Sequence, residues 1–154
     1  MDLAAAAADY EEATRELLAL ASALDEHALD RHVDGAWSAR QIIHHLADAV
    51  SQSYARLRRL LAEPAGSIIQ GYDEAAWAEC ETLGYRELPI EHSLAVIRAV
   101  RDASADIVRR LTPDDLERYA LHSEAGHYSV ATWLKTYTSH PRDHAAQIAE
   151  AIRP

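Results

Sequence analysis

Residues 129–152 read SVATWLKTYTSHPRDHAAQIAEAI, and this stretch shows a clear helical pattern. Its apolar and aromatic side chains recur every three or four residues, at Val130, Trp133, Leu134, Tyr137, Ile148 and Ile152. This spacing predicts one amphipathic helix that begins at Ser129. Pro141 lies inside it and removes a backbone donor, so we expect a kink or a broken turn there. Because the stripe continues beyond Pro141, a single kinked helix is favoured over two helices.

Two histidines, His140 and His144, stand four residues apart on this predicted helix. Residues at this spacing lie one above the other, with about 5–6 Å between their Cβ atoms. Two imidazoles in this arrangement can bind one metal ion. A pair alone is weak evidence, because two surface histidines give the same pattern. The prediction of a metal site therefore needs a third partner.

The stretch WSARQIIHHLADAV, residues 37–50, supplies that partner. Ser38 and Gln41 form the S-x-x-Q pattern of a capping box, which predicts the start of a helix. An apolar stripe follows, and His45 lies on its edge, whereas His44 is turned away by about 100°. We therefore expect His45 to face inward and to be the third ligand. Three neutral imidazoles with open positions suit Zn²⁺ or Ni²⁺.

Two further amphipathic helices are predicted, over residues 3–24 and 89–111. The apolar stripe of the second one includes a charged residue, Arg101. Four long helices with one long crossover, residues 63–89 between the second and third helices, are typical of a four-helix bundle. We therefore predict an all-α fold and a single domain over residues 1–154.

The connections carry weaker signals. Within the crossover, DEAAWAE favours a short helix that is capped by Asp73. The stretch YALHSEAGHYS, residues 119–129, contains Gly126 and is expected to be irregular. Its two histidines, His122 and His127, are expected to form local hydrogen bonds rather than to bind metal.

The composition limits the classes of partner and compartment. The net charge of −10 disfavours nucleic acid and anionic membranes as partners. No apolar run reaches the roughly 18 residues of a membrane span, and the N-terminal stretch lacks the basic start of a signal peptide. The single cysteine, Cys80, cannot form an internal disulfide, which fits the reducing cytoplasm. With nine histidines, a metal site would use His, Asp and Glu.

Three motifs, GAWSARQIIHHLADAV, YDEAAWAE and SVATWLKTYTSHPRDHAAQI, occur in that order and resemble the DinB/YfiT-like superfamily. The chain is most similar to the YfiT-type branch of metal-dependent hydrolases, which is related to the bacillithiol S-transferases. The resemblance implies a four-helix bundle, often a homodimer, with a metal held by His45, His140 and His144. Two positions depart from the family's pattern: Asp143 stands where many relatives have a histidine, and Pro141 separates two ligands.

Three functions agree with these observations, and the alternative to a metal site is three ordinary histidines that bind no metal. In the first, the metal binds a low-molecular-weight thiol such as bacillithiol or mycothiol, and the thiolate attacks an electrophilic small molecule. In the second, a metal-dependent hydrolase activates water against an amide or ester. In the third, a non-catalytic bundle binds a metal or a small ligand, and His127 or Asp143 closes the site as a fourth ligand. No general base is assigned, because Asp48 is expected to be structural or to bond a ligand.

Overall fold

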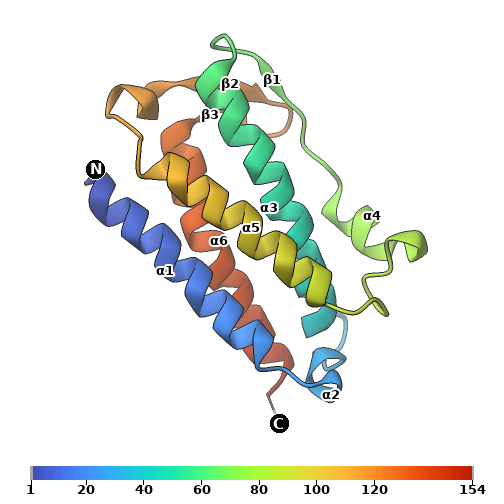
Figure 1. Cartoon of the computed structure of the whole chain (residues 1–154). Coiled ribbons are helices and arrows are strands. Elements are labelled where there is room, and N and C mark those ends of the chain that lie inside the picture. The colour runs from blue at the N-terminus through green and yellow to red at the C-terminus, as the bar shows by residue number, and fades with distance from the viewer. Residues whose placement is uncertain (1, 154) are drawn as a thin grey trace.

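Four long helices form the body of the molecule. The structure, a computed structural model, describes residues 2–153. The long helices are α1 (Leu3–Ser22), α3 (Ala39–Ala62), α5 (Glu91–Val108) and α6 (Val130–Ala151). Helices α1 and α3 each pack against both α5 and α6, so α1 and α3 lie diagonally opposite in the bundle (Figure 1). The predicted four-helix bundle with a long crossover before α5 is confirmed.

Local capping explains where these helices begin. The Ser38 hydroxyl accepts a hydrogen bond from the Gln41 backbone N–H, and the Gln41 side chain accepts one from the Ser38 N–H, so the predicted capping box is confirmed. Helix α6 begins one residue after its predicted start at Ser129, and the Ser129 hydroxyl caps it by accepting a bond from the Thr132 N–H. These bonds satisfy backbone donors that no helical turn can reach.

Two groups of buried side chains make up the core, one toward each end of the bundle. Trp133 lies at the centre of one group, fully buried, with its ring stacked on Tyr10 of α1 at 5.8 Å between centroids. Its indole N–H donates to the Ser53 carbonyl of α3 at 3.0 Å. A single side chain of α6 thus holds both diagonal helices.

A small sheet replaces the irregular stretch that was expected over residues 119–129, so that expectation was wrong. Strands β2 (Tyr119–His122) and β3 (Gly126–Ser129) form an antiparallel hairpin, and β1 (Ile68–Ile69) pairs in parallel with β2. Strands of two to four residues show too little alternation to be recognised in a sequence. The pairing of β1 with β2 also joins segments more than fifty residues apart.

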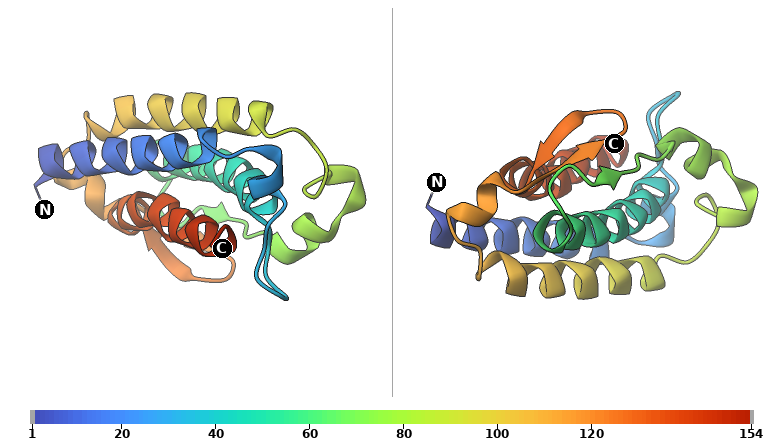
Figure 2. Two further views of the ribbon diagram at one scale, coloured as in Figure 1. Left: turned by 90° about the horizontal axis from the view of Figure 1, so that it is seen from below. Right: turned by 90° about the horizontal axis from the view of Figure 1, so that it is seen from above.

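The crossover runs from the sheet toward the opposite end of the bundle (Figures 1 and 2). It contains β1, the short helix α4 (Glu74–Glu79) and the 3₁₀ turn η1 (Glu81–Leu83). The cap of α4 by Asp73 is confirmed, since the Asp73 carboxylate accepts from the Ala76 N–H. The remaining short elements are α2 (Glu26–Leu29) and the 3₁₀ turn η2 (Asp114–Glu117).

Helix α6 continues through Pro141 without interruption, so the single helix is confirmed and a broken turn is absent from residues 130–151. None of the helices in the described part of the chain has the length and apolar character needed to cross a membrane.

Candidate metal centre

The structure brings the three predicted histidines together. His45 projects from α3, and His140 and His144 project from the adjacent helix α6. One ring nitrogen from each of them lies within 4.8 Å of the other two. Within residues 2–153, no Asp, Glu, Cys or further His joins this group. The arrangement is therefore a three-imidazole cluster, here called the histidine cluster.

The distances within the histidine cluster suit a small divalent ion. The Nε2 atoms of His140 and His144 are 3.1 Å apart. Two nitrogen ligands of a tetrahedral zinc, each at about 2.0–2.1 Å from it, are separated by about 3.3 Å. The His45 ring lies 4.8 Å from the His144 ring and 5.8 Å from the His140 ring, measured between centroids. A small movement of His45 would complete the three-ligand set.

Unpaired nitrogen atoms mark the site most clearly. His45 is 1 % exposed, and neither of its ring nitrogens has a hydrogen-bond partner among the described residues. The buried Nδ1 of His140 also lacks one. Buried polar atoms are almost always bonded, and leaving one unbonded costs about 1–3 kcal/mol. A metal ion bound by one ring nitrogen of His45 would remove that cost for this atom, so the residues fit a metal.

Burial keeps the cluster in the form that metals require. Burial, together with the neighbouring histidines, lowers the pKa of His45 to about 4 and the pKa of His140 to about 3. Burial also lowers the pKa of His144. All three rings are neutral near pH 7, and a neutral imidazole offers a lone pair to a metal.

Gln147 orients one ring of the cluster. Its side-chain oxygen lies 2.8 Å from Nδ1 of His144. An amide oxygen only accepts hydrogen bonds, so Nδ1 carries the proton and Nε2 keeps its lone pair. That lone pair faces the cluster, as is usual for histidine ligands whose second nitrogen bonds a neighbour. The sequence contained this signal in its H-x-x-x-H-x-x-Q spacing, but no role was assigned to Gln147.

A cavity opens at the cluster. Its volume is about 590 Å³, and its lining includes His144, Gln147, Glu74 and an apolar wall of Trp37 and Ile42. The Trp37 ring also lies 5.1 Å from the His45 ring. The sequence pattern gave neither Trp37 nor Glu74 a role at the site. Their place on the site depends on loops that the sequence pattern does not position.

His44 and Asp48 belong to a separate polar group under the crossover. His44 is buried, with Nδ1 2.8 Å from the Ser93 hydroxyl and Nε2 3.0 Å from the Leu88 carbonyl oxygen. Asp48 accepts a hydrogen bond from the Tyr85 hydroxyl. His44 is thus turned away from the histidine cluster, as predicted, but the crossover and α5 bury it.

The other candidates lie apart from the cluster. Nδ1 of His122 accepts bonds from the backbone N–H groups of Glu124 and Ala125, and the His127 ring stacks on Tyr119. His122 forms local hydrogen bonds, as expected, whereas His127 makes a local ring contact instead. Asp143 is exposed beside the cluster and does not join it. The described residues therefore offer no fourth protein ligand from His127 or Asp143.

Known proteins match this chain over most of its length. The sequence profile of the DinB superfamily matches residues 9–148. A protein of Oceanobacillus iheyensis named "Putative metal-dependent hydrolase" is 38 % identical over 119 residues, which cover 77 % of this chain and 67 % of the relative. A Bacillus mycoides protein of the same general name is 31 % identical over 141 residues, covering 91 % of this chain and 79 % of the relative.

A solved structure shares the fold over nearly the whole chain. YfiT from Bacillus subtilis, described as a probable metal-dependent hydrolase with an unusual four-helix bundle topology, aligns with a TM-score of 0.86 and 28 % identity. The alignment covers 97 % of this chain and 85 % of YfiT. From the profile match, the relatives and the shared fold, it follows that this chain belongs to the DinB superfamily.

Proposed function

We propose that this protein is a metal-dependent enzyme in which His45, His140 and His144 hold one divalent ion, Zn²⁺ or Ni²⁺. The observation that carries the proposal is the buried ring of His45, which lies beside His140 and His144 and whose nitrogens have no hydrogen-bond partner within residues 2–153. Three protein ligands leave coordination positions open, which is typical of catalytic rather than structural zinc sites. When bound, the ion would acidify a small nucleophile so that it reacts near neutral pH.

A low-molecular-weight thiol such as bacillithiol or mycothiol is our first candidate for that nucleophile. Metal coordination deprotonates a thiol without the help of a base. This suits a cluster in which Asp48, the nearest carboxylate in the sequence motif, is engaged by Tyr85 instead. The cavity of about 590 Å³ has room for a thiol and an electrophilic small molecule. The enzyme would then be an S-transferase.

Water is the second candidate, and the names of the relatives favour it. Hydrolysis needs a group that accepts a proton from water, and Glu74 in the cavity wall is a carboxylate in a suitable place. Burial raises the pKa of Glu74, which moves it toward the range of a general base. The substrate would be a small amide or ester.

Metal content is the first test. Untagged protein, analysed by elemental analysis, is expected to contain about one divalent ion per chain, because three-histidine sites bind one ion. His144→Ala is expected to lose most of it, and His127→Ala, outside the cluster, is expected to keep it. An equal metal content in all three proteins, or none in the wild type after loading with Zn²⁺ or Ni²⁺, would contradict the proposal.

Turnover then separates the candidate functions. The loaded protein is assayed with thiols against an electrophile such as monochlorobimane, and with amides and esters in the absence of thiol. Thiol-dependent product supports the transferase, and thiol-independent cleavage supports the hydrolase. Bound metal without either activity supports a non-catalytic bundle.

We also propose one domain over residues 1–154, a homodimer and a cytoplasmic location. Size-exclusion chromatography tests the dimer.

A further inference from the structure

Arg101 is a buried charge at the centre of the bundle. It projects from the middle of α5, and only 1 % of the residue is exposed. Its guanidinium lies over the Tyr10 ring, 3.7 Å from the ring centroid. A guanidinium in such a place is costly unless its donors are bonded. The identity of its acceptors therefore indicates why this position tolerates an arginine.

Three hydrogen bonds connect Arg101 to two other helices. Nε–H donates to the Thr14 hydroxyl at 2.6 Å, and an Nη2–H donates to the Tyr10 carbonyl at 2.9 Å, both on α1. An Nη1–H donates to the Tyr137 carbonyl of α6 at 2.7 Å. All three acceptors are uncharged. Arg101 therefore acts as a hydrogen-bonding bridge between α1, α5 and α6.

The bond to Tyr137 meets a specific need of α6. In an α-helix the carbonyl of residue 137 accepts from the N–H of residue 141, which is four positions later. Residue 141 is Pro141, which has no N–H, so this carbonyl loses its helical donor. Arg101 supplies a donor to the same oxygen from another helix. Arg101 thus satisfies the acceptor that Pro141 leaves without a helical donor.

The turn that depends on this bond carries His140. The Tyr137 ring lies 5.9 Å from the His140 ring, and the Tyr137 hydroxyl accepts from Arg56 of α3 at 2.9 Å. Tyr137 is thus held at its carbonyl by α5 and at its hydroxyl by α3. His140 lies between this anchored turn and His144, which places its ring against the cluster.

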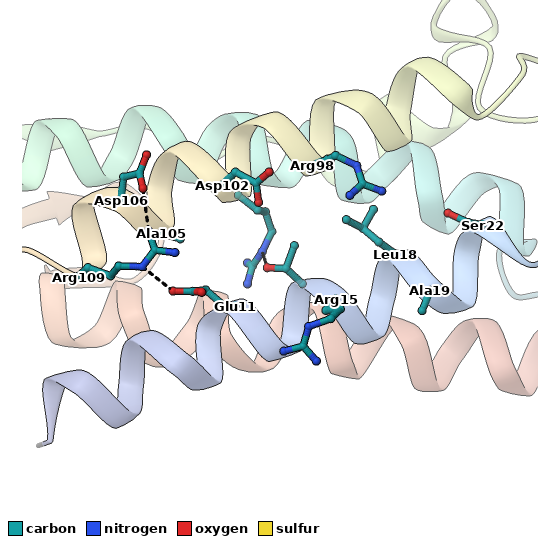
Figure 3. A pocket seen from close by; sticks show the side chains of 12 residues that line it. Glu11, Arg15, Leu18, Ala19, Ser22, Arg98, Asp102, Ala105, Asp106 and Arg109 are labelled. Carbon is teal, nitrogen blue, oxygen red and sulfur yellow. Dashed lines mark hydrogen bonds and ion pairs between the residues drawn. The ribbon is translucent and has the colours of Figure 1, made fainter.

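A groove of about 560 Å³ lies on the surface between α1 and α5, outside the buried Arg101 (Figure 3). Arg109 forms ion pairs there with Glu11 and Asp106, shown as dashed lines in Figure 3. Arg98 also lines this groove and lies one helical turn from Arg101. The donors of Arg101 are already directed to Thr14, Tyr10 and Tyr137, so its role concerns the bundle interior.

We propose that Arg101 is a positioning residue of the metal centre, which replaces the backbone donor missing at Pro141 and so fixes the turn of α6 that presents His140 to the ion. The metal part of this inference rests on the function proposed above. The inference explains how a proline can lie between two ligands of one helix. It also predicts that Arg101 and Pro141 are coupled, because Arg101 should affect metal binding only while residue 141 is proline.

A double-mutant cycle tests the pair. The variants are Arg101→Met, Pro141→Ala and the double variant, with Arg98→Met as the matched control on the same helix. In Arg101→Met we expect the dissociation constant for Zn²⁺ to rise about tenfold or more, as when a group supporting a metal ligand is removed. In the double variant, the introduced alanine has a backbone N–H that bonds the Tyr137 carbonyl, so the constant should return to within about threefold of Pro141→Ala.

The Co²⁺ absorption spectrum provides a second readout, because it reports ligand geometry rather than stability. We expect Arg101→Met to change it, and both the double variant and Arg98→Met to preserve it. Equal losses of affinity with and without Pro141 would overturn the proposal, as would a loss in Arg98→Met as large as in Arg101→Met. If Arg101→Met does not fold, Arg101→Lys is compared in the two backgrounds with the same expectation.

A metal-free measurement separates this proposal from the proposed function. In histidine ring NMR spectra of the apo-protein, Arg101→Met should shift the His140 signals more than those of His122, and Pro141→Ala should reverse the shift. This result is expected even if the wild type binds no metal, and would then leave Arg101 as the residue that positions His140. Unchanged His140 signals would refute the role of Arg101 even if metal binds.

Discussion

At the scale of single residues, the histidine cluster depends on which ring nitrogen carries a proton. Gln147 determines this for His144, since its oxygen accepts from Nδ1–H and leaves Nε2 for the ion. His45 has no such partner among the described residues, so its orientation relies on packing, including the Trp37 ring at 5.1 Å. The cluster thus combines one ligand held by a hydrogen bond with one held by contact.

Gln147→Leu tests the orienting bond. It removes the acceptor, so either tautomer of His144 becomes available, and we expect the metal dissociation constant to rise about tenfold. Gln147→Glu is the matched control, because a carboxylate also accepts from Nδ1–H, and its affinity should stay near that of the wild type. The measurement is competition with a zinc chelator. Equal affinities of Gln147→Leu and wild type would contradict the role given to Gln147.

At the scale of elements, α3 and α6 carry the whole cluster, and each begins at a serine cap. The caps fix the first turn of each helix and thereby the register in which the histidines face the core. The crossover is attached to the sheet near its start, where β1 pairs with β2. The crossover is therefore anchored before it reaches Glu74 and the cavity.

Ser38→Ala tests the cap of α3. It removes the bond from the Gln41 N–H, and we expect the free energy of unfolding to fall by about 1 kcal/mol. Ser51→Ala is the control, because Ser51 lies within α3 and bonds only the Ala47 carbonyl of its own helix, so a change within about 0.5 kcal/mol is expected. Urea unfolding of the metal-free proteins measures both. Equal decreases in the free energy of unfolding of the two variants would show that the cap contributes no more than an ordinary hydroxyl within the helix.

At the scale of the whole molecule, one ion would join α3 to α6, two helices whose ligands are about 100 residues apart in the chain, at His45 and His144. A ligand that binds only the folded state stabilises it, by about 2.7 kcal/mol at a free concentration one hundred times its dissociation constant. Metal binding and the stability of the bundle are therefore linked.

Chelation tests this link. Excess EDTA is expected to lower the Tm of the loaded protein by about 5 °C or more, because the stabilisation by the ion is lost. His45→Ala should melt at the same temperature with and without EDTA. His127→Ala, outside the cluster, should respond like the wild type. If neither metal nor chelator changes the Tm of the wild type, a site that links α3 to α6 is contradicted.

Much of this molecule follows from sequence-local physics. Three features depend only on residues within one or two turns, and they were predictable for that reason: the helix periodicity, the caps at Ser38 and Asp73, and the inward face of His45. The same periodicity put His140 and His144 on one face. What these patterns determined was the bundle and three candidate ligands.

Tertiary structure alone decided the rest, because it depends on segments that meet only after folding. The pairing of β1 with β2, the Trp37 and Glu74 walls of the cavity, and the burial of His44 all join distant parts of the chain. The bond from Arg101 to the Tyr137 carbonyl is the sharpest case. The sequence shows that Pro141 removes a donor, but only helix packing determines which side chain replaces it.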